Sequence, residues 1–356
     1  MTAVLSRAAP PANAMAVPRV GGRWLLAAIG FLAVTAGAAT LVGADSLPTA
    51  TVVKALARHL PLLRVQGVGP SDAAIVWQIR LPRVVLAGLV GAMLALAGAT
   101  YQGVFANPLA DPYLLGAASG AEVGATLAIA YAPAAWAVDA VPICAFVGAA
   151  GAVAAAVLLG RSIGSGRSTT VLILAGVAVG AFLTAIESYV QQQHQAAIRL
   201  IYSYVLGRLG TAGWSGVRLV LPYLAVSGAV ILLHRRHLDV LSLGDVEAAS
   251  LGVNVGRTRM LLVAAATLGT AAAVAMAGTI AFVGIVVPHT VRLLTGGSYR
   301  TILPLSMIAG AGFLIVCDLA ARTLTAPGEL PIGVITAFVG APFFIVLLRR
   351  SHRLAT

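Results

Sequence analysis

The stretch RLPRVVLAGLVGAMLALAGATYQGVFANPLADP, residues 80–112, decides the fold class of this chain. Two arginines flank a Leu-Pro pair, a long run without charge follows, and Asn-Pro and Asp-Pro turns close the segment. An uncharged run of about twenty residues can cross the hydrocarbon core of a bilayer. The arginines before it must stay at the aqueous edge. The segment therefore predicts a membrane-spanning helix with a paired-arginine patch at one mouth.

Composition extends this prediction to the whole chain. Of 356 residues, 60% are apolar and 10% are charged, whereas a soluble domain carries roughly 25% charged residues. The net charge of +12 comes almost entirely from arginine, since Lys54 is the one lysine. The arginines stand singly or in pairs between apolar runs, which favours membrane edges over nucleic acid as their partner. Cys144 and Cys317 lie inside apolar runs and are predicted to be free thiols.

Hydropathy and turn residues predict an all-α polytopic membrane protein with about ten transmembrane helices. Residues 1–22 are expected to form a disordered cytoplasmic tail, and residues 23–350 a single transmembrane domain. Short amphipathic helices on the membrane surface are expected within 49–63 and 198–209. The predicted spans are 24–43, 83–104, 113–131, 140–160, 170–192, 217–234, 259–277, 279–293, 302–321 and 332–348.

The distribution of cations gives the orientation. With a cytoplasmic N-terminus, the predicted spans place 14 arginines on the cytoplasmic side and 9 cations outside. The excess supports cytoplasmic N- and C-termini. Nine outer cations are many for this rule, and a functional need for arginines outside would explain part of that number.

Three carboxylates are predicted to lie at membrane depth, where they are costly and face a protein interior or a water-filled path. Asp318 precedes Arg322 by four residues, so the two are expected to pair on one helical face. Glu187 opens the polar stretch ESYVQQQHQ, which either lines a path or emerges into water. The third is Glu122. No series of carboxylates or histidines follows one route, which disfavours a proton-driven carrier.

Several functions are excluded or disfavoured by missing motifs. The sole lysine, Lys54, has no glycine nearby, so a P-loop is impossible and the chain does not hydrolyse ATP by one. The spacings H-E-x-x-H and C-x-x-C are absent, as are other signs of a metal site. Ser119 would need a partner base to act as an intramembrane nucleophile, so an enzyme is disfavoured. Gly116, Gly120 and Gly124 instead predict close helix packing.

Six stretches, in order and together, resemble the permease subunits of bacterial ABC importers for iron-siderophores, haem and cobalamin. The resemblance covers roughly residues 75–350 and is looser over 185–215. The stretches are RLPR (80–83), ANPLADP (106–112), LAGVA (174–178), LGV (251–253), GTIAFVG (278–284) followed by PH (288–289), and ELPIG (329–333) followed by GAPFF (340–344).

The resemblance implies a multi-pass permease of the bacterial inner membrane that forms a homodimer and has no catalytic residue. Two separate ATPase subunits, which hold ATP and Mg, would sit on the cytoplasmic face, and a periplasmic or lipid-anchored binding protein would dock outside. The chain itself would need no cofactor. The expected substrate is an iron chelate, siderophore or haem, with cobalamin as the alternative. An ion-coupled secondary transporter is a weaker alternative.

The resemblance also assigns roles to particular residues. Outer arginines would meet carboxylates of the binding protein, because guanidinium binds carboxylate through two hydrogen bonds; these are Arg80, Arg83 and Arg322. Within 242–252, the residues expected to contact the ATPase are Asp245, Glu247, Ala248, Ala249, Leu251 and Gly252. Asp245 is also predicted to cap a helix, and the two alanines to give a small surface that fits a groove. Ser168 and Thr169 resemble a cytoplasmic gate, with Thr170 beside them, and Glu187 is expected to line the path.

Overall fold

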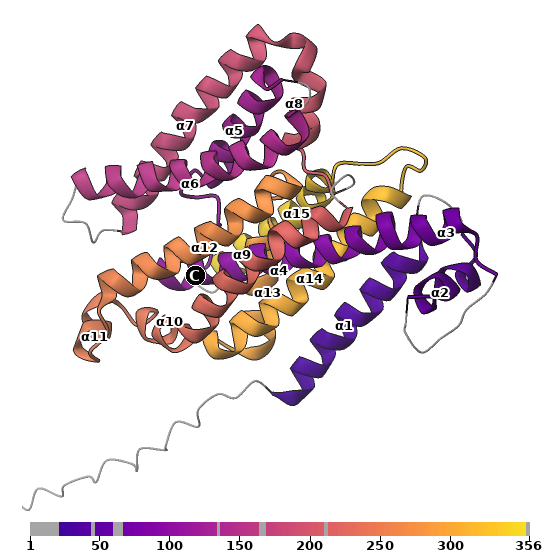
Figure 1. The fold of residues 1–356 in the computed structure, drawn as a ribbon. Helices are drawn as coiled ribbons and strands as arrows, with labels where there is room; N and C mark the ends of the chain where they lie inside the picture. The colour runs from indigo at the N-terminus through magenta and orange to yellow at the C-terminus, as the bar shows by residue number, and fades with distance from the viewer. Residues whose placement is uncertain are drawn as a thin grey trace, which may run out of the picture.

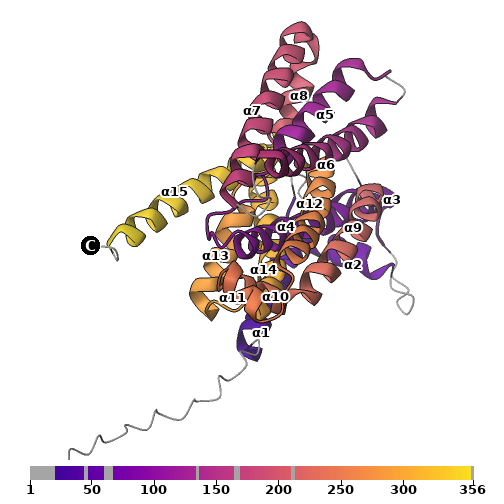
Figure 2. The ribbon, with the colours of Figure 1, turned by 90° about the vertical axis from the view of Figure 1, so that its left-hand side faces the viewer.

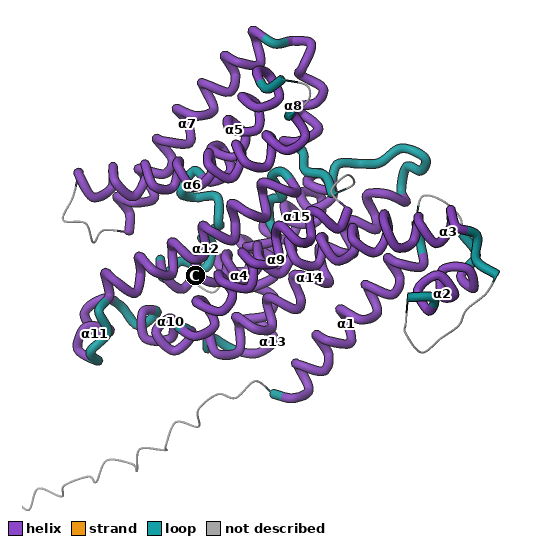
Figure 3. The backbone as a smooth tube through the Cα atoms, viewed as in Figure 1, coloured by secondary structure: helices purple, strands orange, loops and turns teal. Residues whose placement is uncertain are grey.

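A computed structural model describes residues 21–43, 47–59, 67–133, 136–163, 169–209 and 213–353. Within these ranges the chain is helical and contains no strand (Figure 3). Seven of the described helices are long and apolar enough to cross a membrane, and two shorter apolar helices, Val283–Thr295 and Ile332–Val346, accompany them. The all-α membrane fold is thus confirmed, and the count of ten spans is approximate. The predicted tail lies outside the described residues except for Gly21 and Gly22.

The described helices are α1 (Gly22–Leu41), α2 (Thr49–Ala57), α3 (Pro70–Ala74), η1 (Ile75–Arg80), α4 (Leu81–Val104), α5 (Ala117–Tyr131), α6 (Ala137–Ile163), α7 (Thr169–Gln193), η2 (Gln195–Ala197), α8 (Ile198–Val205), α9 (Gly213–Leu233), α10 (Arg235–Leu241), α11 (Asp245–Ser250), α12 (Val255–Ala277), α13 (Val283–Thr295), α14 (Tyr299–Thr323) and α15 (Ile332–Arg353). The longest loop among the described residues is 105–116, between α4 and α5.

The helix α4 lies at the centre of the molecule. It continues from α3 and η1 as one helical run from Pro70 to Val104, most of which is buried. Its end is set by the predicted turns: the side chains of Asn107 and Asp111 accept hydrogen bonds from the backbone N–H groups two residues on, at 2.9 and 2.8 Å. Such local bonds replace helical ones and stop the helix.

Two groups of helices pack against each other around α4 and α12. The helices α5, α6, α7 and α8 form one group, drawn at the top of Figure 1. The other group contains α1, α4, α9, α13 and α14. The helix α12 contacts both, since it packs on α6 as well as on α4 and α9. The helix α15 touches α13 and α14 and then extends away from the rest (Figure 2).

The predicted glycine packing is present between α5 and α6. A Cβ atom on Gly120 would overlap the carbonyl oxygen of Gly148, and one on Gly124 would overlap that of Cys144. The backbones of these two helices are therefore in direct contact, as small residues at four-residue spacing allow in lipid. Gly116, at a φ of 82°, sits in the left-handed region and starts α5 at Ala117, later than the predicted 113.

The helix α13 starts at Val283, not at the predicted residue 279, because the backbone turns at 278–282. Gly278 and Phe282 both have positive φ, 70° and 69°. A helix of 13 residues rises about 20 Å, which is less than the roughly 30 Å of a bilayer core. The non-helical residues before it therefore lie at membrane depth. They bond to the end of α8: Thr279 Oγ1 donates to Val205 O at 2.5 Å, and Arg208 N donates to Ala277 O at 2.8 Å.

The two ends of the spanning helices differ. One end carries α2, α3 and the loop between α14 and α15; the opposite end carries α10 and α11 (Figure 1). The orientation expected from the arginine count would make the first end the outer one and the second end the cytoplasmic one. Helices are present at both positions where surface helices were predicted, as α2 and α8, and their location on the membrane surface stays a prediction; α10 is an additional short helix.

Candidate functional site

An ion-pair cluster joins α4, α14 and the segment after α14, at the end of the molecule that is expected to face outward. Arg83 Nε lies 2.9 Å from Asp318 Oδ1, and Arg83 Nη1 lies 2.8 Å from Glu329 Oε1. Arg322 Nε lies 3.3 Å from Asp318 Oδ2, which confirms the predicted pair. The side chain of Asp318 is 1% exposed, so two guanidinium groups compensate a fully buried carboxylate. We call these four residues the outer cluster.

Two of the predicted docking arginines point into the protein, toward the end of α1. Arg80 Nη1 donates to Leu41 O at 3.3 Å, and Arg322 Nη2 donates to Ala39 O at 2.5 Å. Carbonyls in the last turn of a helix have no intrahelical donor and carry partial negative charge. Arg80 and Arg322 are 4% and 3% exposed, so both fix α1 in place. The structure brings the three predicted arginines together, and Glu329, with a side chain 47% exposed, is the outermost group.

The segment α10–α11, residues 235–250 with the turn that follows, exposes large apolar side chains. Leu243, Val246 and Leu251 are 63%, 79% and 63% exposed. The sequence analysis singled out Leu251 but missed Leu243, in the turn before α11, and Val246, on α11; the signal for both was their position among polar residues. Among the predicted contact residues, Glu247, Ala249 and Gly252 are exposed.

Two predictions for this segment are wrong. Ala248 is fully buried and belongs to the main core, so it adds nothing to the partner-facing surface. In a helix of six residues, one side must face the protein, and position 248 is on that side. Asp245 does not cap α11: Gly244 occupies the N-cap position with a φ of 121°, and the carboxylate of Asp245 points elsewhere.

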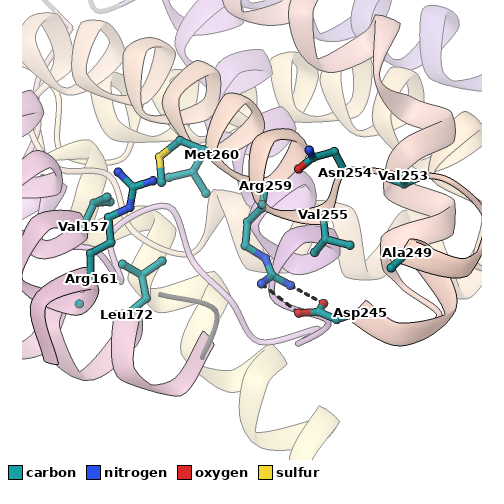
Figure 4. Close-up of a pocket in the computed structure, with 13 residues that line it drawn as sticks. Val157, Arg161, Leu172, Asp245, Ala249, Val253, Asn254, Val255, Arg259 and Met260 are labelled. Atoms are coloured by element: carbon teal, nitrogen blue, oxygen red, sulfur yellow. Dashed lines mark hydrogen bonds and ion pairs between the residues drawn. The ribbon is translucent and has the colours of Figure 1, made fainter. Parts of the chain in front are cut away.

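Asp245 is paired with Arg259 on α12. Arg259 Nη2 lies 2.7 Å from Asp245 Oδ1, and Arg259 Nη1 donates to Asp245 Oδ2 at 3.3 Å. This two-pronged pair borders a cavity of about 360 Å³ between the ends of α6 and α7 and the start of α12 (Figure 4). Arg161 of α6 lines the opposite wall of that cavity. The pair ties the exposed helix α11 to a long spanning helix.

Asp239 on α10 caps the N-terminus of α14, a contact that the sequence did not reveal. Its Oδ1 accepts the backbone N–H of Tyr299 at 2.5 Å, and its Oδ2 accepts Ser298 Oγ at 3.2 Å. Arg300 Nε lies 3.4 Å from Asp239 Oδ2. The first N–H groups of a helix lack intrahelical acceptors and favour a negative charge. Ser298 before the helix marks a cap in the sequence, but nothing there indicates a capping residue from another helix.

The predicted gate and path residues lie on or beside α7. Ser168 lies outside the described residues, and Thr169 and Thr170 are the first residues of α7. Glu187 is 6% exposed and accepts hydrogen bonds from Gln191 Nε2 at 2.8 Å and from Thr126 Oγ1 of α5 at 3.5 Å. Of the two alternatives left open for Glu187, emergence into water does not fit this burial.

Asp111 lies outside the spanning helices, in the loop between α4 and α5, and its pKa is clearly shifted by the fold. Burial raises the pKa of this carboxyl from 3.8 to about 6, although the N–H of Tyr113 partly offsets the shift. The neighbouring Tyr113 hydroxyl donates to Ile280 O at 3.1 Å. The loop is thereby fixed to the non-helical residues before α13.

Comparison with known proteins assigns the family. The family model described as the FecCD transport family matches residues 27–350. The cobalamin import system permease protein of Halobacterium salinarum is 44% identical over 285 residues, which cover 80% of this chain and 75% of that protein. The Fe(3+) dicitrate transport system permease protein of Escherichia coli is 40% identical over 287 residues, covering 80% of this chain and 88% of the relative.

A solved structure agrees with this assignment. It was described as an inward-facing conformation of a putative metal-chelate type ABC transporter, and it superposes with a TM-score of 0.80 at 29% identity. The match covers 93% of this chain and 100% of the other. The fold and the sequence thus point to the same group of transport proteins. This multi-pass membrane chain belongs to the FecCD transport family.

Proposed function

We propose that this chain is the membrane-spanning permease of an ATP-dependent ABC importer that moves an iron chelate, a siderophore or haem, across the bacterial inner membrane. The observation that carries this proposal is the apolar surface of Leu243, Val246 and Leu251 on α11 and its flanking turns. Exposed apolar groups clustered among polar residues mark an interaction site for another protein. Cobalamin is the alternative substrate, because a relative with 44% identity is named for its import.

The proposed partner at this surface is a separate ATPase, two copies of which hold ATP and Mg. The chain has one lysine and no P-loop, so the energy for transport must come from elsewhere. The charged residues Asp245 and Glu247 and the small residues Ala249 and Gly252 lie around the apolar surface and would form its rim. The permease itself performs no chemical step and needs no cofactor; its task is to change which side its path faces.

A homodimer fits the unpacked helices. Phe338 of α15 and Phe182 of α7 are 75% and 67% exposed, and α15 extends away from the rest of the chain (Figure 2). A second copy would cover α15 and enclose a path between the two chains. The gate is proposed at Ser168 and Thr169 on the cytoplasmic side, with Glu187 on the same helix further along. Both termini are proposed to be cytoplasmic.

The outer cluster and Arg80 are the proposed docking area for a periplasmic or lipid-anchored binding protein. Three arginines, Arg80, Arg83 and Arg322, meet in this area beside the carboxylates of Asp318 and Glu329. Because Arg80 and Arg322 are buried, Arg83 is the arginine that an incoming carboxylate would reach, by replacing Glu329. Bidentate binding by a guanidinium suits such an exchange.

Reconstitution tests this function. The permease, its ATPase and its binding protein are placed in liposomes, and uptake of a labelled iron-siderophore, haem or cobalamin is measured. We expect uptake of an iron chelate that requires both ATP and the binding protein. Uphill uptake by the permease alone would refute the proposal and favour an ion-coupled carrier. Arg83→Glu should remove the stimulation by the binding protein.

A further inference from the structure

The coupling segment α10–α11 is attached to two different spanning helices by two carboxylates. Asp239 binds the N-terminus of α14 through the backbone N–H of Tyr299 at 2.5 Å. Asp245 binds Arg259 of α12 at 2.7 Å. The first attachment joins residues 60 positions apart in the chain and the second joins residues 14 positions apart.

We infer that Asp239 and Asp245 are positioning residues that carry the movement of the coupling segment to α14 and α12. The inference rests on the proposed function and adds the residues through which ATP-driven motion enters the membrane part. If α11 could slide over the protein surface beneath it, a movement of the ATPase would displace α11 alone and would not reach the spanning helices. The two carboxylates prevent this sliding.

The packing of α11 shows why a polar link is needed. The helix has six residues, of which Ala248 alone is buried. One methyl group offers little resistance to sideways displacement, since burying a single CH₂ contributes about 0.8 kcal/mol. The pair of Asp245 with Arg259 fixes direction as well as distance, because the guanidinium of Arg259 makes two parallel bonds. The side chain of Arg259 is 14% exposed and that of Asp245 is 46% exposed, so the pair lies at the border between the protein and water.

The two receiving helices lead to different parts of the molecule. The helix α12 lies between the group of α5 to α8 and the group around α4, so its displacement changes the contact between the groups. The helix α14 has 25 residues and spans about 37 Å. Its far end carries Asp318 and Arg322 of the outer cluster. A shift at Asp239 would therefore reach the proposed docking area for the binding protein.

The test measures substrate imported per ATP hydrolysed in the complete reconstituted importer. For Arg259→Lys we expect intact assembly and continued ATP hydrolysis, with import per ATP lowered about tenfold, the size of a typical coupling effect. Asp245→Asn should lower the same ratio, measured in the complexes that have assembled, because Asp245 also lies at the rim of the ATPase surface. Exchanging the charges in Asp245→Arg with Arg259→Asp should restore most of the ratio. For Asp239, Asp239→Ala should lower the ratio more than Asp239→Asn, which keeps an oxygen acceptor for Tyr299 N.

The matched control is Asp139→Asn, which removes an exposed carboxylate at the start of α6 and should leave the ratio unchanged. Co-purification of the ATPase and monodispersity in detergent establish that each variant has assembled. The inference is overturned if the ratio stays at the wild-type value in the Asp245 and Asp239 variants. It is also overturned if ATP hydrolysis and import fall in equal proportion, or if the charge exchange restores nothing. A wild-type protein without ATP-dependent import would instead refute the proposed function.

Discussion

Removal of the buried charge in the outer cluster should destabilise the protein strongly. In Asp318→Asn, the neighbouring Arg322, with a side chain 4% exposed, loses its carboxylate partner, while Arg83 keeps Glu329 at 2.8 Å. Breaking a buried ion pair on one side costs about 3–5 kcal/mol. We take the lower bound of about 3 kcal/mol, because Arg322 still donates to Ala39 O. For a chain of 356 residues, an unfolding entropy of about 2.1 cal/mol/K per residue makes this a loss of roughly 4 °C in apparent Tm.

The measurement is thermal unfolding of the purified protein in detergent, followed by intrinsic fluorescence. Glu329→Gln is the matched control: it removes a carboxylate of the same cluster, but one 47% exposed, and should cost about 0–1 kcal/mol. The double variant Asp318→Leu with Arg322→Met should recover part of the loss, since no buried charge then lacks a partner. A drop for Asp318→Asn no larger than that for Glu329→Gln would refute this reasoning.

Three further predictions concern other parts of the fold. Gly148→Ala should lower the apparent Tm by several degrees, because its Cβ would overlap the carbonyl oxygen of Gly120, whereas Gly151→Ala, three residues on in α6 with open space around it, should not. Because folding raises the pKa of the Asp111 carboxyl from 3.8 to about 6, protonation of this group stabilises the folded state. That contribution is complete below pH 3.8 and is lost as the pH rises through 6, so the apparent Tm should fall over this range in wild type and less in Asp111→Asn. Val246→Asp should leave the Tm unchanged, since Val246 is 79% exposed, but should abolish co-purification of the ATPase; retained binding would argue against α11 as the contact.

The sequence predicted features that depend on local spacing. Long uncharged runs gave the membrane class, and the four-residue interval gave the pair of Asp318 with Arg322. The Asn-Pro and Asp-Pro turns stopped α4 where expected. In each case the relevant atoms are close in the chain, so helix or turn geometry alone brings them together.

Contacts between distant segments could not be predicted in this way. Arg83 meets Asp318 across 235 positions, and Asp239 meets Tyr299 across 60, so neither partner is indicated by any period in the sequence. The same limit explains the error at Ala248, whose orientation depends on the core beneath α11. The docking role of Arg80 stays a prediction. Because Arg80 is buried against α1, a binding protein would contact this area through Arg83 and not through Arg80 directly.

The break in the helical chain before α13 has a consequence for how this protein can move. Peptide groups outside a helix are tolerated within a bilayer only where protein shields them from hydrocarbon. Here α8 provides that shield, since Val205 and Arg208 bond directly to 277–279. A transport cycle that separated α8 from this turn would leave bare amides facing lipid. We therefore expect α8 and the turn at 277–279 to move together as one rigid unit. Rearrangement during transport would then take place at other helix contacts, where the backbone hydrogen bonds lie within each helix.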